Sequence, residues 1–329
     1  MSTQFKAFVL SKDRKNNQIG NIKNLLLDDL MEGDVTIKIK YSSFNYKDGL
    51  AIAGKKPIIK TWPMIPGVDF CGKVIKSESP NFQINDKVIL NGWGVGEKHY
   101  GGFSEYARVK SEWLLKLPEK FTEEQAMIIG SAGYTSMLCV MSIIEDISPS
   151  KGEVLVTGAS GGVGSIAVHL LSKLGYGVVA STGKVEENDF LKKIGAFRIL
   201  DRKEIGSINT APLLKQIWAA AIDTVGGNTL SNILSQIKYG GVVAATGLAQ
   251  SADLNTTVYP FILRNITLRG IDSVYAPLNK RIKAWSMLSD LVDRKFLNTI
   301  KIVKKFKDLK NLSNEIIKGK IKGRIIIKI

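Results

Sequence analysis

The sequence has few of the side chains that bind transition metals. Its 329 residues include two histidines, His99 and His169, and two cysteines, Cys71 and Cys139. A zinc site needs three or four nitrogen, sulfur or oxygen ligands in a tetrahedral arrangement. We therefore expect no metal site and no disulfide framework. His169 is expected on the outer face of a helix and His99 in a solvated loop or beside a cleft. Cys71 is expected in a buried strand, where a free thiol packs as a small apolar group.

Long hydrophobic runs are also missing. No apolar stretch reaches the roughly 18 residues that a helix needs to span a bilayer. Residues 1–17 lack the basic head, apolar middle and small-residue cleavage site of a secretory signal. A chain with few cysteines and no disulfide framework suits a reducing compartment. We expect a cytoplasmic protein with no membrane partner.

Acidic residues are scarce relative to basic ones. The chain has 46 Lys and Arg against 30 Asp and Glu, which gives a formal net charge of +16. Such a charge would allow a non-enzymatic nucleic-acid binder, whose affinity for RNA would fall steeply with salt. The lysines are scattered, however, and at 301–312 and 318–324 they alternate with apolar residues, as on solvated faces. We expect no nucleic-acid partner; a positive field would attract substrates and cofactors that carry phosphates.

The length of the chain and its early strand patterns suit two domains, the first of them rich in β-structure. Residues 35–41 alternate apolar and polar side chains, the pattern of a half-buried strand, and further strands are expected at 86–93 and 101–110. The final residues, 323–329, read as another strand. We expect this tail to return to the β-rich domain.

From residue 122 onward, strand patterns alternate with helical ones. Thr122 and Gln125 form a capping-box start for a helix over 122–147. Alternating strands and helices build a parallel, doubly wound sheet. The strands are expected at 154–157, 176–182, 197–200, 220–225 and 240–247, and the helices at 162–174, 186–196, 211–220 and 228–237.

The strongest motif is Val-Leu-Val-Thr-Gly-Ala-Ser-Gly-Gly-Val-Gly-Ser at residues 154–165. An apolar strand runs into the glycines, and an amphipathic helix follows. Ala159, Gly161 and Gly164 stand at the spacing of a dinucleotide fingerprint. Glycines let the backbone approach a pyrophosphate, and the N–H groups at a helix start attract negative charge. The motif predicts a dinucleotide site; the alternative is a tight structural turn.

The end of the next strand indicates which dinucleotide binds. An NAD site usually places Asp or Glu about 20 residues further on, but here the strand ends in Ser181, Thr182, Gly183 and Lys184. Hydroxyl and ammonium groups would hold a 2′-phosphate, which a carboxylate would repel. Arg202, after the third strand, would add a second cation. This pattern predicts NADPH; the alternative is an ordinary polar loop.

The order of a β-rich domain, a nucleotide domain and a β tail resembles the medium-chain dehydrogenase/reductase superfamily over essentially the whole chain. Where the zinc alcohol dehydrogenases of that superfamily carry a His–Glu pair, this chain has Val68 and Asp69. It also lacks their four-cysteine lobe. Six stretches are similar to the zinc-free, quinone oxidoreductase-like branch and, within it, to the acrylyl-CoA reductase subgroup: 42–55, 63–74, 91–102, 126–143, 221–227 and 260–277.

The resemblance implies an α/β fold made of two domains. A GroES-like β-rich catalytic domain would span 1–121 and 300–329, and a doubly wound Rossmann NADPH-binding domain would span 122–299. The implied activity is NADPH-dependent reduction of the C=C bond of acryloyl-CoA to propionyl-CoA, without a metal. A quinone or small-enone reductase on the same fold is the alternative. The family also implies a homodimer formed by edge strands of the nucleotide domains.

The resemblance further implies a set of cofactor contacts. Lys184 stands where the subgroup often has arginine, so the charge is kept but the fork geometry is lost. The implied contacts are Gly162, Val163, Gly164 and Ser165 at the pyrophosphate, next to Gly161, then Thr182, Gly183, Lys184 and Arg202 at the adenosine phosphate, and Leu248, Ile262 and Ser273 towards the nicotinamide.

Without a metal, hydrogen-bond donors must stabilise the developing enolate. In related reductases the position of Tyr46 faces the nicotinamide and the substrate. Tyr46 is therefore the candidate donor or proton source, and Asn45 would position cofactor or substrate. The alternative is that Tyr46 only packs beside the cofactor while water supplies the proton. Lys47 and Asp48 are expected to form a structural pair at a helix start.

Overall fold

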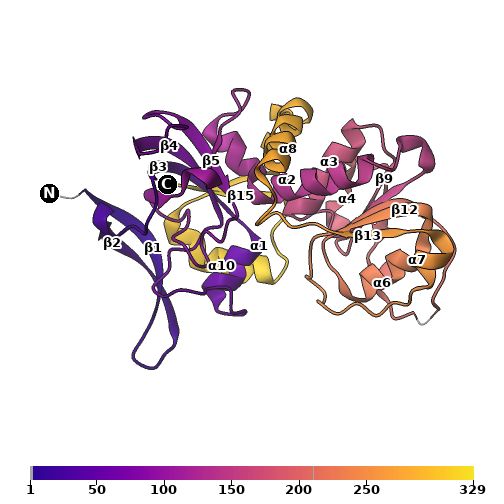
Figure 1. Ribbon diagram of the computed structural model, residues 1–329. Coiled ribbons are helices and arrows are strands. Elements are labelled where there is room, and N and C mark those ends of the chain that lie inside the picture. The colour runs from indigo at the N-terminus through magenta and orange to yellow at the C-terminus, as the bar shows by residue number, and fades with distance from the viewer. Residues whose placement is uncertain (1–2, 210) are drawn as a thin grey trace. The chain divides into compact units, whose positions relative to one another are not determined.

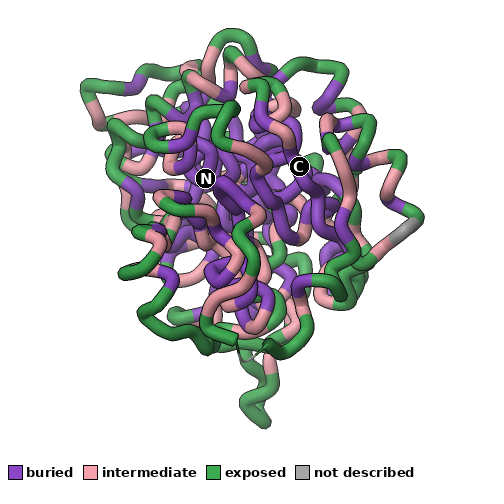
Figure 2. Tube along the Cα trace, turned by 90° about the vertical axis from the view of Figure 1, so that its right-hand side faces the viewer, coloured by how far each residue is buried: buried purple, intermediate pink, exposed green. Residues whose placement is uncertain are grey.

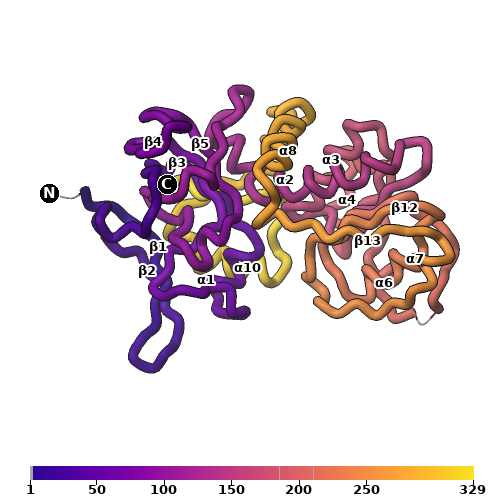
Figure 3. Tube along the Cα trace, in the orientation of Figure 1, coloured from indigo at the N-terminus to yellow at the C-terminus, as the bar shows by residue number. Residues whose placement is uncertain are grey.

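The computed structural model describes residues 3–209 and 211–329, and Figures 1 and 3 trace their path by colour. The chain divides into two compact units, each of which joins separate stretches of sequence. Unit 1 is Met1–Ser131, Ser273–Pro277 and Asp293–Ile329, and unit 2 is Ala132–Asp272 and Leu278–Val292. The domain boundaries expected from the sequence, at 121/122 and 299/300, stay a prediction.

Unit 1 is built mainly from antiparallel strands. β1 (Gln4–Lys12) pairs antiparallel with β2 (Gln18–Leu26). The strands of a second sheet are β3 (Val35–Phe44), β4 (Asp69–Ser77), β5 (Lys87–Asn91), β6 (Tyr106–Val109), β7 (Leu115–Lys116), β14 (Lys301–Lys304) and β15 (Arg324–Lys328). Their order is β14-β15-β3-β4-β5-β7, and β6 also pairs with β3.

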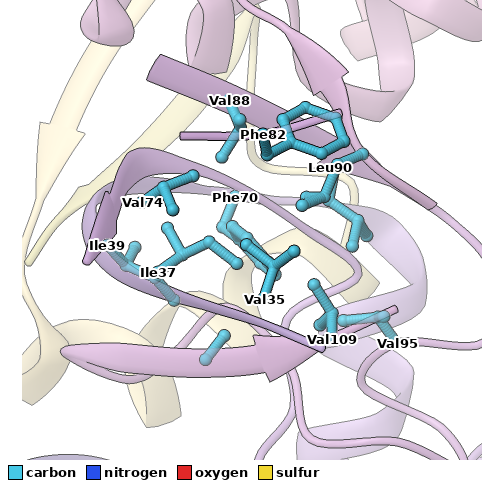
Figure 4. Close-up of a cluster of buried hydrophobic side chains, with 12 residues drawn as sticks. Val35, Ile37, Ile39, Phe70, Val74, Phe82, Val88, Leu90, Val95 and Val109 are labelled. Carbon is cyan, nitrogen blue, oxygen red and sulfur yellow. The ribbon is translucent and has the colours of Figure 1, made fainter. Parts of the chain in front are cut away.

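The predicted alternation along β3 is confirmed by burial from Ile37 to Lys40, whereas Thr36, expected on the polar face, is 5% exposed. Val35 and Ile37 are fully buried and Ile39 nearly so, whereas Lys38 and Lys40 are exposed. The three apolar side chains belong to a core cluster to which β4, β5 and β6 also contribute (Figure 4). Burial of these apolar surfaces is what fixes the register of β3, because a slip by one residue would turn the lysines inward.

The C-terminal tail returns to the β-rich unit, as expected. β15 pairs antiparallel with β3 and parallel with β14. Ile325, Ile326 and Ile327 are buried, and so is Arg324 at the start of the strand. The tail therefore brings a guanidinium group into the interior, next to the end of β3 that leads into the first helix.

Helices complete unit 1 and begin the next. They are α1 (Tyr46–Ala53), α9 (Arg294–Ile300) and α10 (Leu309–Ile317). α2 (Glu123–Ile144) is broken at Gly130, which adopts φ 50° and ψ −159°. The expectation that no stretch is long and apolar enough to span a bilayer is wrong for α2, which could do so by length and composition; 78% of its apolar window, however, is buried inside the protein. It is therefore a core helix.

Unit 2 is a parallel sheet with helices between its strands. The strands are β8 (Val154–Val156), β9 (Val178–Thr182), β10 (Arg198–Asp201), β11 (Trp218–Asp223), β12 (Ile237–Ala245) and β13 (Thr267–Gly270). The helices are α3 (Gly162–Lys173), α4 (Asn188–Lys193), α5 (Lys203–Gly206), α6 (Gly227–Gln236), α7 (Tyr259–Arg264) and α8 (Leu278–Leu291). The order β10-β9-β8-β11-β12-β13 confirms the doubly wound topology.

Strands β8, β9 and β11 are buried along their whole length, and such buried stretches are purple in Figure 2. Covered on both faces, these strands are rich in Val, Ile and Ala, which is typical of parallel sheets.

The helix expected at 211–220 is wrong. Residues 211–217 form no regular element, and β11 begins at Trp218. The backbone N–H groups of Leu214 and Ile217 donate to the carbonyls of Ser235 and Gln236. Trp218 is 2% exposed and its indole N–H donates to the Gln236 side chain. Tertiary hydrogen bonds and burial of the tryptophan thus override a spacing that would also fit a helix.

Candidate active site

The glycine-rich loop lies between β8 and α3, the arrangement that the sequence predicts. Gly158 takes a positive φ of 56°, and a Cβ on Gly164 would overlap the Gly158 carbonyl oxygen. Glycine at 164 therefore lets the helix pack closely on the loop. Gly161 is the N-cap of α3, and because glycine has no side chain the helix start has no side-chain cap. The first N–H groups of a helix have no partner within the helix, so this loop fits a pyrophosphate.

Two residues of this motif also make protein contacts. The Val163 carbonyl accepts a hydrogen bond from Ser136 Oγ at 2.7 Å. Ser165 is fully buried, and its backbone N–H donates to the Gly161 carbonyl. Its Oγ has no hydrogen-bond partner among the described residues. The roles of both residues toward a cofactor stay predictions.

The residues predicted at the adenosine phosphate meet at the ends of two neighbouring strands. In the parallel pair β9–β10, Thr182 is the partner of Asp201, and the Arg202 N–H donates to the Thr182 carbonyl at 2.9 Å. A Cβ on Gly183 would overlap Nε of Arg202. The arginine side chain therefore crosses directly over a position that has no side chain. This cradle fits a phosphate group that needs a guanidinium held in place.

Lys184 completes this corner and has an acidic neighbour that the sequence analysis missed. The Lys184 N–H donates to Thr182 Oγ1 at 3.2 Å, and Nζ lies 3.0 Å from Oε1 of Glu187. Glu187 is 4% exposed, whereas Glu186 beside it is exposed. Two adjacent glutamates read alike in sequence. The turn Val185–Glu187 is what directs one of them inward.

The residues predicted near the nicotinamide lie on three separate segments. Leu248 follows β12 and is 54% exposed, and Ile262 on α7 is 68% exposed. Ser273 begins the short segment Ser273–Pro277, which belongs to unit 1. Its carbonyl oxygen lies 3.1 Å from where a Cβ on Gly92 would stand. Their contacts with a cofactor stay predictions.

Tyr46 and Asn45 stand at the start of α1 and differ sharply in their surroundings. Tyr46 is 41% exposed, so its ring and hydroxyl are open to a ligand. Asn45 is the N-cap of the helix. Its Nδ2 donates to Ser43 Oγ, Asp48 Oδ2 and Asp69 Oδ2 at 3.1–3.3 Å. The Asn45 amide thus bonds to groups of the protein itself. If Asn45 positions the cofactor or substrate as predicted, it would do so by fixing the start of α1.

Asn45 belongs to a buried polar cluster that joins distant parts of unit 1. Arg324 donates from Nη1 to Asn45 Oδ1 at 3.1 Å, from Nη2 to Ser43 Oγ at 2.9 Å and from Nε to the Ile128 carbonyl at 2.9 Å. Asp69 accepts from the N–H and the hydroxyl of Ser43. We call Ser43, Asn45, Asp48, Asp69 and Arg324 the buried polar cluster.

The break in α2 fits against this cluster. The backbone N–H of Ser131 donates to Asp69 Oδ2 at 2.7 Å. A Cβ on Gly130 would stand 2.5 Å from Ser43 Oγ and 2.6 Å from Arg324 Nη2. The positive φ of Gly130 and the absence of its side chain therefore let the helix supply an N–H to the carboxylate.

Asp48 has a strongly shifted pKa within the cluster. Burial raises the pKa of Asp48 to about 7, and the nearby Asp69 carboxylate adds to the rise. Hydrogen bonds from the Asn45 and Val68 N–H groups oppose it. Burial lowers the pKa of Arg324, which the two carboxylates oppose. Two acids facing one guanidinium favour the protonated form of one acid.

The predicted pair of Lys47 and Asp48 is wrong. Lys47 Nζ instead lies 2.8 Å from Glu97 Oε1, because successive residues at a helix start point in different directions. Asp48 points inward and accepts from the backbone N–H of Asn45, as the N3 residue of a capping box.

The histidines and cysteines serve packing. His99 is 8% exposed, donates from Nε2 to the Arg108 carbonyl at 2.8 Å and lies edge-on to Trp113, so its expected place in a solvated loop is wrong. His169 is 6% exposed, so its expected place on the outer face of a helix is wrong. Cys71 is fully buried, as predicted, and burial raises its thiol pKa. Within residues 3–209 and 211–329, no three His, Cys, Asp or Glu are grouped to hold a metal ion.

Two family descriptions match the chain. Residues 31–119 match the alcohol dehydrogenase GroES-like domain, and residues 162–292 match the domain described as zinc-binding dehydrogenase. These are the β-rich region and the parallel-sheet region of the fold described above.

Several curated relatives match over nearly their full length. The chain is 48% identical to the probable acrylyl-CoA reductase AcuI of Escherichia coli, covering 98% of this chain and 99% of that protein. It is 43% identical to the acrylyl-CoA reductase AcuI of Ruegeria pomeroyi, covering 99% of each. It is 41% identical to the putative quinone oxidoreductase YhfP of Bacillus subtilis, covering all of both chains.

Solved structures agree with these matches. The yhdH oxidoreductase of Salmonella enterica in complex with NADP superposes with a TM-score of 0.96 at 47% identity, covering 99% of this chain and 100% of that one. Bacillus subtilis yhfP with NAD bound gives a TM-score of 0.95 at 41% identity, covering all of both chains. The glycine loop, the two-part fold and these full-length likenesses lead to one conclusion: the chain belongs to the medium-chain dehydrogenase/reductase superfamily, in the group that contains the acrylyl-CoA reductases.

Proposed function

We propose that this protein reduces the C=C bond of acryloyl-CoA with NADPH and releases propionyl-CoA. The observation that carries the proposal is full-length identity of 43–48% to two proteins named as acrylyl-CoA reductases. The cradle of Gly183 and Arg202 beside Lys184 adds a place for the 2′-phosphate that distinguishes NADPH from NADH.

The residues of this chain would divide the work of the reaction. NADPH, when bound, supplies a hydride to the β-carbon of the thioester. The hydroxyl of Tyr46 would donate a hydrogen bond to the thioester oxygen as negative charge develops there, or provide the proton for the α-carbon. Asn45 would hold the start of α1 through the buried polar cluster, and so fix where Tyr46 stands.

The cofactor would lie on unit 2 residues that share one edge of the sheet. The carboxyl ends of β8, β9 and β10 carry the glycine loop, Thr182 and Arg202, the usual ligand side of an open α/β sheet. The first N–H groups of α3, from Gly162 to Gly164, would take the pyrophosphate, because the Gly161 N–H already donates to the Gly158 carbonyl. Ser165 is proposed beside them. Leu248, Ile262 and Ser273 are proposed for the nicotinamide end.

A quinone reductase is the second candidate, because a relative with 41% identity is named a putative quinone oxidoreductase. Both activities consume NADPH, so an assay can distinguish them only by the substrate that is offered. Purified protein is mixed with NADPH and either acryloyl-CoA, crotonyl-CoA or 1,4-benzoquinone, and the loss of cofactor absorbance is followed. We expect turnover to be fastest with acryloyl-CoA. Rapid quinone reduction without turnover of acryloyl-CoA would reject the first function and favour the second.

The role of Tyr46 has its own test. We expect Tyr46→Phe to lower kcat with acryloyl-CoA by about 10²-fold, the usual range for one donor or one general acid. Tyr239→Phe, a change on an exposed tyrosine of unit 2, is the matched control and should leave kcat unchanged. Unaltered turnover in Tyr46→Phe would leave water as the proton source.

Three further properties are part of the proposal. The enzyme would work without zinc, since Val68 and Asp69 stand where the zinc alcohol dehydrogenases have a His–Glu pair whose His is a metal ligand; metal analysis of active protein tests this. It would form a homodimer through β13, whose Thr267 and Gly270 are exposed; light scattering gives the mass. The site of action would be the cytoplasm, which fractionation of cells expressing the protein tests.

A further inference from the structure

Glu187 is a buried carboxylate that no step of the proposed reaction uses. Its Oε1 lies 3.0 Å from Lys184 Nζ, and the Glu187 side chain is 6% exposed against 32% for that of the lysine. Its second oxygen, Oε2, is buried and has no hydrogen-bond partner among the described residues. A buried carboxylate with one oxygen that accepts no hydrogen bond lowers the stability of the fold. Its presence here therefore points to a functional role more strongly than that of a surface acid would.

The surroundings of Glu187 are the residues of the proposed 2′-phosphate site. Lys184 is tied to Thr182 through its backbone N–H, and Arg202 crosses over Gly183. Arg202 is exposed and forms no ion pair with a carboxylate among residues 3–209 and 211–329, whereas the charge of Lys184 is balanced by Glu187. A phosphate arriving here meets one free cation and one that is already paired.

We propose that Glu187 is a specificity-determining residue that weakens the preference of this protein for NADPH over NADH. Resting on the proposed cofactor site, this inference adds a residue that opposes the phosphate. The carboxylate would neutralise Lys184 and repel the dianionic 2′-phosphate. The sequence pattern predicts two cations for the phosphate, Lys184 and Arg202, but the pairing of Lys184 leaves one effective charge.

The size of the effect follows from electrostatics. At the effective dielectric constant of a protein surface, a unit charge near a phosphate changes the binding affinity roughly tenfold once screening by salt is included. Removing the charge of Glu187 should therefore tighten binding of a 2′-phosphorylated nucleotide about tenfold. It should leave a nucleotide without that phosphate nearly unaffected.

The test measures binding of two nucleotides by titration calorimetry, independently of turnover. Full-length protein is titrated with 2′,5′-ADP and with ADP, for the wild type, Glu187→Gln and the matched control Glu186→Gln, which removes the same charge from the exposed neighbouring position. We expect Glu187→Gln to bind 2′,5′-ADP about tenfold more tightly, with a steeper dependence on salt, and ADP within twofold of the wild type. Glu186→Gln should change both affinities by less than twofold.

Other outcomes overturn the proposal. If Glu187→Gln binds 2′,5′-ADP as the wild type does, the carboxylate has no influence on selection. If it binds more weakly, Glu187 orients Lys184 toward the phosphate and the proposed sign is wrong. Glu187→Met, which retains side-chain length without charge, serves if the Gln variant fails to fold. A wild type that prefers ADP to 2′,5′-ADP would reject the NADPH site itself, whereas lack of acryloyl-CoA turnover with normal titrations would reject only the substrate.

Discussion

The buried polar cluster of unit 1 and the predicted adenosine-phosphate site of unit 2 are built in opposite ways. We call the latter, made of Thr182, Gly183, Lys184, Glu187 and Arg202, the phosphate corner. In the cluster, Arg324, Asn45 and Asp69 are each held by several hydrogen bonds away from solvent. In the phosphate corner, Arg202 and Gly183 are exposed, and a single ion pair joins Lys184 to Glu187. The first arrangement fixes geometry and tolerates little change. The second sets a balance of charge that one substitution can alter without harm to the fold.

The largest effect is expected from breaking the cluster at its cation. Arg324→Met leaves Asp48 and Asp69 buried without their guanidinium, so the free energy of unfolding should fall by about 3–5 kcal/mol. Urea unfolding followed by circular dichroism measures the change. Arg14→Met, at an exposed arginine of the same unit, should stay within about 0.5 kcal/mol of the wild type. A loss below about 1 kcal/mol for Arg324→Met would show that the arginine does not hold the cluster.

A smaller effect is expected from pH, through Asp48. Its pKa is raised from 3.8 to about 7 in the folded protein, so between these values the folded state binds more protons than the unfolded state. Stability from this group is therefore fully present below about pH 4 and is lost as pH rises through 7. The loss should be up to about 4 kcal/mol.

Urea midpoints at pH 5 and pH 8 measure this dependence. Asp48→Asn should be less stable at both values, because its amide would face donor N–H groups, but its midpoint should change less between them. Asp189→Asn, at an exposed acid of unit 2, should keep the wild-type difference. An equal pH dependence in wild type and Asp48→Asn would contradict the raised pKa.

The smallest effect is expected in the phosphate corner. In Gly183→Ala the new Cβ would displace the side chain of Arg202, which can move because it is long and exposed. We expect the affinity for NADPH relative to NADH to fall about tenfold, one charge-assisted contact being lost, while unfolding changes by less than about 0.5 kcal/mol. Fluorescence titration gives the affinities. Gly177→Ala, where the nearest atom to the new Cβ lies 3.9 Å away, is the control; an unchanged ratio in Gly183→Ala would remove Arg202 from the site.

The same contrast explains what could be predicted from the sequence. Local sequence patterns predicted strand β3, the glycine loop and the strand ends at Thr182 and Arg202, because each of these features depends on neighbours in the chain. Arg324 looked like one polar residue in a strand, since its partner Asn45 lies 279 positions away. Glu187 could not be told from Glu186, because burial is decided by the turn. The failed helix at 211–220 has the same cause: its hydrogen bonds go to residues outside the segment.

The glycine that breaks α2 also limits how this protein can be altered. Any side chain at Gly130 would have to adopt a disfavoured backbone and enter space filled by Ser43 and Arg324. Redesign of α2 must therefore keep this residue and vary other positions of the helix. In a library that randomises the whole helix, position 130 would report how strictly the selection demands a stable fold. If variants with another residue at this position survive, the selection accepts destabilised proteins.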